Sequence, residues 1–158
     1  MEAKILTLPL FHVVGFAVEA SVEAFEAGLG KEIYQSLVDR KDEIHNKKNE
    51  NVTLIQIYPM DPDFNPQVDR FTHLICYEVN ELGEVPQHMI SHTVTESKYV
   101  AFTHKGLESE LSRTYEYLYR QWIPDSGNEP KDYDFEIWDE RYHPESPDNE
   151  IDVYVALK

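Results

Sequence analysis

The segment Lys98–His104, KYVAFTH, is followed by a helical stretch from about Glu108 to Trp122 and then by the acidic segment Asp134–Glu140, DFEIWDE. The first and third segments are rich in Val, Ile, Phe, Tyr and Trp, which is typical of strands. A proline and a glycine soon after the middle segment favour the end of a helix there. The apolar segment Ile151–Leu157, IDVYVAL, follows a proline-containing loop and predicts one more strand. The order of elements is therefore β-α-β-β.

The first half of the chain repeats this order. His12–Glu19 reads as a strand, Phe25–Ile44 as a helix, and Thr53–Tyr58 and Phe71–Val79 as two further strands. A duplication of this kind predicts an α+β fold, with the repeated β-α-β-β units forming an antiparallel sheet that carries two helices on one face and a ligand groove on the other. We expect a single domain over residues 1–158, with pseudo-repeats at approximately 1–80 and 94–158.

Composition excludes several classes of protein. The chain has 158 residues, of which 41% are hydrophobic and 28% charged, and this balance is typical of a globular protein rather than a disordered one. Acidic residues number 30 against 14 basic ones, and the formal net charge of −16 disfavours direct binding to nucleic acid or to an anionic membrane. The single cysteine, Cys76, allows no intrachain disulfide. Without a basic leader or a long apolar segment, we expect the cytoplasm as the compartment.

Side-chain alternation along the strands predicts where the sheet is lined with aromatic rings. We expect the aliphatic residues of the last strand, Val153, Val155 and Leu157, to lie under the helices. The inner sets of the other strands would then be Ile55, Ile57, Leu74, Cys76, Phe135 and Ile137. This phase places Glu136 on the face away from the helices, and it gathers around Glu136 four aromatic residues: Tyr58, Tyr77, Trp138 and Tyr154.

The second helix adds more rings. Tyr115, Tyr119 and Trp122 share one helical face at spacings of four and three residues, and we expect them to reach into the groove. Each of these rings taken alone is also consistent with ordinary core packing, and Glu136 taken alone is consistent with a solvated sheet residue. The combination of one carboxylate with several phenols favours a small-molecule site.

Two kinds of chemistry follow for Glu136. Burial among aromatic rings raises the pKa of a carboxyl group. The ionised form would attract a lipophilic cation, with cation–π attraction of roughly 0.5–2 kcal/mol for each ring. The partly protonated form would serve as a general acid or base near neutral pH. The sequence leaves both open.

Neither a metal nor a cofactor is expected, because His88 and His92 read as surface histidines on an extended linker.

The second half also resembles a known family. Residues 99–106, YVAFTHKG, together with Thr114-Tyr115, residues 119–127, Asp134–Ile137 and Ile151–Val155, resemble the GyrI-like effector-binding family. This family is similar to the effector-binding domains of AraC-type and MerR-type transcription regulators. The resemblance implies a groove between two β-α-β-β units. It also implies an acidic groove residue at Glu136, an aromatic one at Tyr154, and helix aromatics at Tyr115 and Tyr119.

The resemblance and the residues together leave three hypotheses. The first is a binding protein for lipophilic, often cationic, small molecules, acting with a separate regulator or sequestering a toxic compound. The second is a hydrolase of strained-ring compounds, since some relatives hydrolyse cyclopropane-containing toxins; Glu136 and Tyr154 would then be catalytic. The third is an acidic inhibitor of a DNA-binding enzyme such as gyrase, which the net charge motivates. Because no DNA-reading segment precedes the domain, a self-contained transcription factor is not expected.

Overall fold

The computed structural model describes residues 2–158 and contains one eight-stranded antiparallel sheet. Its strands are β1 (Lys4–Leu8), β2 (Phe11–Ala20), β3 (Lys47–Ile57), β4 (Phe71–Val79), β5 (Ile90–Val94), β6 (Ser97–Lys105), β7 (Pro130–Trp138) and β8 (Glu150–Leu157). The spatial order is β1-β6-β8-β7-β3-β4-β2-β5. The predicted α+β class with an antiparallel sheet is confirmed.

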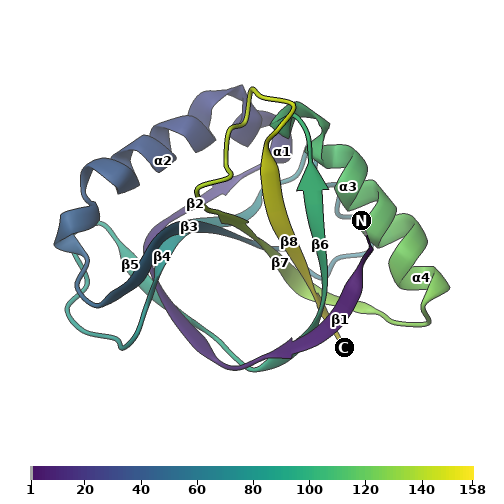
Figure 1. Ribbon diagram of the computed structural model, residues 1–158, viewed down its shortest axis with the longest axis horizontal. Coiled ribbons are helices and arrows are strands. Elements are labelled where there is room, and N and C mark those ends of the chain that lie inside the picture. Colours follow the sequence, from purple (N-terminus) through teal and green to yellow (C-terminus); the bar gives the residue numbers. More distant parts are fainter. Residues whose placement is uncertain (1) are drawn as a thin grey trace.

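Two helical segments lie on the outer face of the curled sheet (Figure 1). The first consists of α1 (Val22–Ala24), the π-helical turn η1 (Phe25–Leu29) and α2 (Gly30–Asp39), and a 3₁₀ turn, η2 (Lys41–Glu43), follows it. The second consists of the 3₁₀ turn η3 (Glu108–Glu110), α3 (Leu111–Tyr117), the π-helical turn η4 (Leu118–Trp122) and α4 (Ile123–Asp125). Within residues 2–158, no helix is long and apolar enough to cross a membrane.

The sheet order reflects the repeated unit. The strands of one unit stand in the order β6-β8-β7 and those of the other in the order β3-β4-β2, so that β7 and β3 join the two units at the centre. The strands β1 and β5 extend the sheet at its two edges. Sequence patterns predicted the six inner strands, whereas β5 falls in a stretch that reads as an extended linker. The central β3–β7 pair therefore contains one strand from each half of the chain.

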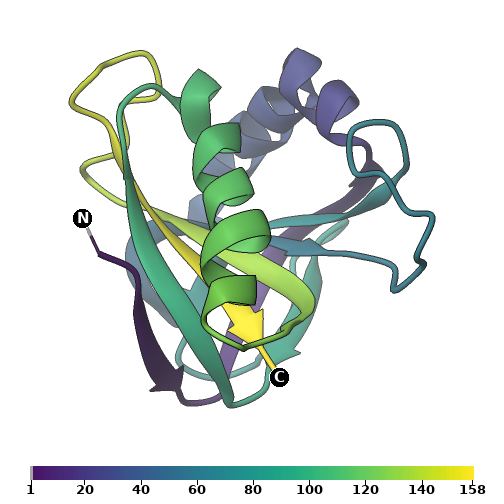
Figure 2. The ribbon, with the colours of Figure 1, turned by 90° about the vertical axis from the view of Figure 1, so that its right-hand side faces the viewer.

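Both faces of the sheet are buried. Between the sheet and the helices lies a core that includes Leu37, Leu118, Ile123, Val153 and Val155. On the other face, inside the curl of the sheet, a second core fills the space that separates the ribbons in Figure 1. Its members include the buried residues Val13, Ile55, Leu74, Cys76, Tyr99 and Phe135. The view in Figure 2 shows α3 in front of the sheet, on the same side of it as α1 and α2.

The burial of both faces corrects the predicted strand phase. The aliphatic set of β8 lies under the helices as expected. The sets Ile55, Ile57, Leu74, Cys76, Phe135 and Ile137 were expected there as well, but they lie on the opposite face. Because apolar residues cover both faces, an alternating aliphatic set does not show which face the helices occupy. Consequently Glu136, Trp138, Tyr58 and Tyr77 lie on the helix-bearing face and not away from it.

Candidate functional site

Glu136 lies near the end of β7, under the second helical segment, and is 2% exposed. The hydroxyl of Tyr115 on α3 donates to Glu136 Oε2 at 2.5 Å, and the indole Nε1 of Trp138 donates to Oε1 at 2.9 Å. Burial raises the pKa of Glu136 to about 7, and these two hydrogen bonds oppose the shift. Asp134 and Glu108 add to it through their negative charge. The carboxyl therefore changes its charge near neutral pH.

Asp134 is a second buried acid in the same place, and sequence reasoning missed it. Its Oδ2 accepts hydrogen bonds from the hydroxyls of Tyr58 and Tyr119, each at 2.7 Å. Burial raises the pKa of Asp134 to about 7, against the effect of these two bonds. The signal was present in the sequence as the spacing D-F-E, because residues i and i+2 of a strand share a face. The alternation of side chains along a strand was therefore sufficient to predict that Asp134 lies beside Glu136.

The aromatic walls come from both helical segments and from one loop. Tyr115 and Tyr119 stack with ring centroids 6.4 Å apart and an interplanar angle of 18°. Near Glu136, Trp138 stacks on Tyr142 with ring centroids 4.7 Å apart. The ring centroid of Tyr34 on α2 lies 5.5 Å from that of Trp138. Sequence reasoning missed both of these tyrosines as site residues. Tyr34 lies within the predicted first helix, Phe25–Ile44, and Tyr142 lies in a loop without a periodic pattern.

A third carboxylate borders the site at the start of the second helical segment. The hydroxyl of Tyr142 donates to Glu108 Oε2 at 2.6 Å. The ion pairs of residues 2–158 involve other carboxylates, and none of them reaches Asp134, Glu136 or Glu108. In residues 2–158, these three acids therefore meet hydroxyl and indole donors but no positively charged side chain. In the part of the chain that the structure describes, no three His, Cys, Asp or Glu side chains gather as metal ligands.

Three predicted site residues lie elsewhere: Tyr154, Tyr77 and Trp122. Tyr154 is on the opposite face of the sheet, where it stacks on Phe135 at 4.7 Å, so it does not stand beside Glu136. Tyr77 shares the helix-bearing face, but its ring packs in the core under Lys47, and burial raises its pKa to about 12. The hydrolase hypothesis expected Glu136 and Tyr154 to act together. In the structure, the tyrosine that bonds to Glu136 is Tyr115.

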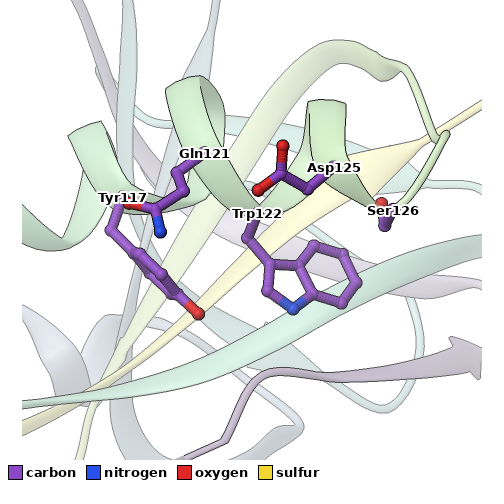
Figure 3. Close-up of a pocket in the computed structure, with 5 residues that line it drawn as sticks. All are labelled: Tyr117, Gln121, Trp122, Asp125 and Ser126. Atoms are coloured by element: carbon purple, nitrogen blue, oxygen red, sulfur yellow. The ribbon is translucent and has the colours of Figure 1, made fainter.

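Trp122 is separated from Tyr119 by a change in helix geometry. The amide of Ile123 bonds to the carbonyl of Leu118, five residues back, so the turn η4 is wider than an α-helical turn. Trp122 thereby lines, with Tyr117, Gln121, Asp125 and Ser126, a hollow of about 240 Å³ on another side of the helix (Figure 3). The regular spacing of four and three residues did not reveal this π-helical turn.

Comparisons with known proteins agree with this architecture. The sequence profile described as "GyrI-like small molecule binding domain" matches residues 1–158. The transcriptional regulator BrlR of Pseudomonas aeruginosa is 29% identical over 159 residues, which cover 99% of this chain and 56% of BrlR. The chain thus spans about half the length of this curated relative.

Two solved structures share the fold. SAV2435, solved bound to tetraphenylphosphonium, superposes with a TM-score of 0.77 at 17% identity, covering 100% of this chain and 94% of SAV2435. EcmrR, solved in a complex with DNA, gives a TM-score of 0.70 at 16% identity, covering 99% of this chain and 57% of EcmrR. At these identities, the two structures show that the fold is the same.

Proposed function

The chain belongs to the GyrI-like small molecule binding domain family, and we propose that it is a receptor for lipophilic cations, which it binds at Glu136. The family relates it to the effector-binding domains of transcription regulators. The proposal rests chiefly on one observation: Glu136 is buried among aromatic rings, and no cationic side chain among residues 2–158 pairs with it. A buried carboxylate without a positive partner is unfavourable, and a bound cation removes that cost.

The ligand class follows from what surrounds the carboxylate. Tyr115, Tyr119, Trp138 and Tyr142 offer aromatic faces, each of which attracts a cation by roughly 0.5–2 kcal/mol. A small hydrated cation would lose its water shell in such a place, whereas a lipophilic cation has little hydration to lose. The structure of SAV2435 bound to the lipophilic cation tetraphenylphosphonium supports the same class for this chain.

Binding requires the tyrosines to move. The hydroxyl of Tyr115 and the indole of Trp138 donate hydrogen bonds to the two oxygens of Glu136. A ligand that contacts the carboxylate must displace at least the Tyr115 hydroxyl, and rotation of the Tyr115 side chain opens space next to Tyr119. Such binding fits a sensor that acts with a separate regulator, and it equally fits sequestration of a toxic compound.

Calorimetric titration with tetraphenylphosphonium at pH 8 tests the proposal. We expect Glu136→Gln to weaken binding at least tenfold, which corresponds to about 1.4 kcal/mol, because the near-isosteric amide carries no charge. Glu96→Gln removes an exposed carboxylate from the turn between β5 and β6. It serves as the matched control, and we expect its affinity to be unchanged. Tetraphenylborate, which has the same shape and the opposite charge, should not bind. Equal affinities of wild type and Glu136→Gln for tetraphenylphosphonium would refute the role of Glu136.

A further inference from the structure

Asp134 has an acceptor that the rest of the protein does not satisfy. The residue is 0% exposed, and its Oδ2 receives the hydroxyls of Tyr58 and Tyr119. Its Oδ1 is also buried, yet no donor among residues 2–158 lies within hydrogen-bond distance of it. Buried carboxylate oxygens normally have partners, because leaving one without a donor is unfavourable. Within the binding site, this oxygen therefore favours a ligand group that carries positive charge.

Asp134 and Glu136 form two parallel arrangements of the same kind. Each carboxylate receives a hydroxyl from the second helical segment, Asp134 from Tyr119 and Glu136 from Tyr115. Each also receives a second aromatic donor, the hydroxyl of Tyr58 or the indole of Trp138. Stacking of the Tyr115 and Tyr119 rings joins the two arrangements. The site thus repeats one carboxylate and two aromatic donors along β7.

The spacing of the two carboxylates suits two separate charges. Residues i and i+2 of a strand lie about 7 Å apart on the same face. A single metal ion would need both carboxylates within its short coordination distance, and no third acidic, histidine or cysteine ligand gathers there in the described chain. Glu108 adds further negative charge next to Glu136. One positive charge would leave much of this negative charge unneutralised.

We propose that the site is built for organic dications, with one positive centre at Asp134 and the other at Glu136. The ligand class is a flat aromatic dication whose charges stand about 7 Å apart, matching the strand spacing. The aromatic body of the ligand lies along the tyrosine pair, and its two ends face the two carboxylates. This inference rests on the proposed function, because it extends cation binding at Glu136 to a second charge at Asp134.

Two probes of nearly the same shape test the inference. Methyl viologen carries two positive charges at the ends of a bipyridine, and N-methyl-4-phenylpyridinium carries one on the corresponding frame. In calorimetric titrations at pH 8 and physiological ionic strength, we expect the dication to bind at least tenfold more tightly than the monocation. Asp134→Asn should reduce the affinity for the dication to that for the monocation, and should change the affinity for the monocation less than threefold. Glu136→Gln should weaken both.

The net charge of the protein attracts any dication, so a charge control is needed. Glu96→Gln removes one exposed carboxylate and should leave the preference for the dication intact. If Asp134→Asn does not fold, the ratio of the two wild-type affinities at about 1 M salt decides instead, because screening there removes the long-range attraction of the net charge. Similar affinities of the wild type for the two probes, or failure of both to bind, would overturn the inference. In that case, binding of tetraphenylphosphonium that depends on Glu136 shows that the proposed function still holds, and absence of that binding shows that both have failed.

Discussion

The two faces of the sheet use tyrosine in opposite ways. Inside the curl of the sheet, the hydroxyls of Tyr99 and Tyr133 bond to each other at 2.8 Å, and Tyr154 stacks on Phe135. On the helix-bearing face, the hydroxyls of Tyr115 and Tyr119 bond instead to buried carboxylates. The first face pairs these two hydroxyls with each other. The second face buries acids that lack a positive partner among residues 2–158, and this is the feature that sets it apart from the first.

Asp152 shows the same contrast at the level of a carboxylate. It shares the side of β8 on which Tyr154 lies, and Arg141 donates to it at 2.7 Å. Asp134 and Glu136 have no such partner among residues 2–158. A carboxylate with its own arginine contributes to structure, whereas one without a cation is available to a ligand.

The largest expected effect concerns the stability of the face inside the curl. Phe135→Ala removes a buried ring that packs against Phe11, Tyr99 and Tyr154, and we expect it to lower the free energy of unfolding by about 3–5 kcal/mol. Glu136→Gln, on the other face, should cost less than about 1 kcal/mol at pH 8, because it removes a buried charge. Guanidinium unfolding of both variants measures the difference. A greater loss of stability in Glu136→Gln than in Phe135→Ala would reverse the assignment of the two faces.

An intermediate effect concerns the pH dependence of stability. The pKa of Asp134 is raised from 3.8 to about 7 in the folded protein, so the folded state holds a proton more tightly than the unfolded chain. This contribution to stability is complete below the unfolded value and is lost as the pH rises through about 7. Between pH 5 and pH 8, wild type should therefore lose on the order of 2–3 kcal/mol relative to Asp134→Asn. Parallel unfolding measurements at the two pH values test this, and identical pH profiles for the two proteins would contradict the burial of an unpaired acid.

The order of elements could be predicted from the sequence, and the family resemblance named Glu136, Tyr115 and Tyr119 as groove residues, but the hydrogen bond between Glu136 and Tyr115 was not predicted. The β-α-β-β order follows from the spacing of apolar residues and from the prolines between segments. The contact between the strand and the helix at Glu136 did not follow, because the predicted strand phase placed Glu136 on the face away from the helices. The assignment of the faces could not be predicted, because Phe135 and Ile137 look like residues that face helices when in fact a second core covers them.

The remaining differences have local causes that a periodic pattern does not contain. Trp122 turns away from Tyr119 because η4 is a π-helical turn. Tyr142 reaches Trp138 because Arg141 bonds to both Asp139 and Asp152 and so folds the loop back over the sheet. The ion pair between Arg141 and Asp152 forms only in the folded protein, so the sequence of the loop did not predict that Tyr142 lies in the site.

The most direct test of cation binding by a buried carboxylate is the proton that binding releases. Tyr115 on α3, Glu108 on η3, Tyr142 of the loop, Tyr58 and Asp134 face Glu136, whose pKa of about 7 leaves it partly protonated at neutral pH. A bound cation favours the ionised form, so a proton passes to the buffer. Titration of tetraphenylphosphonium at pH 7 in phosphate and in Tris should give different observed enthalpies for the wild type, and a smaller difference for Glu136→Gln. The same enthalpy in both buffers, with binding intact, would contradict the account.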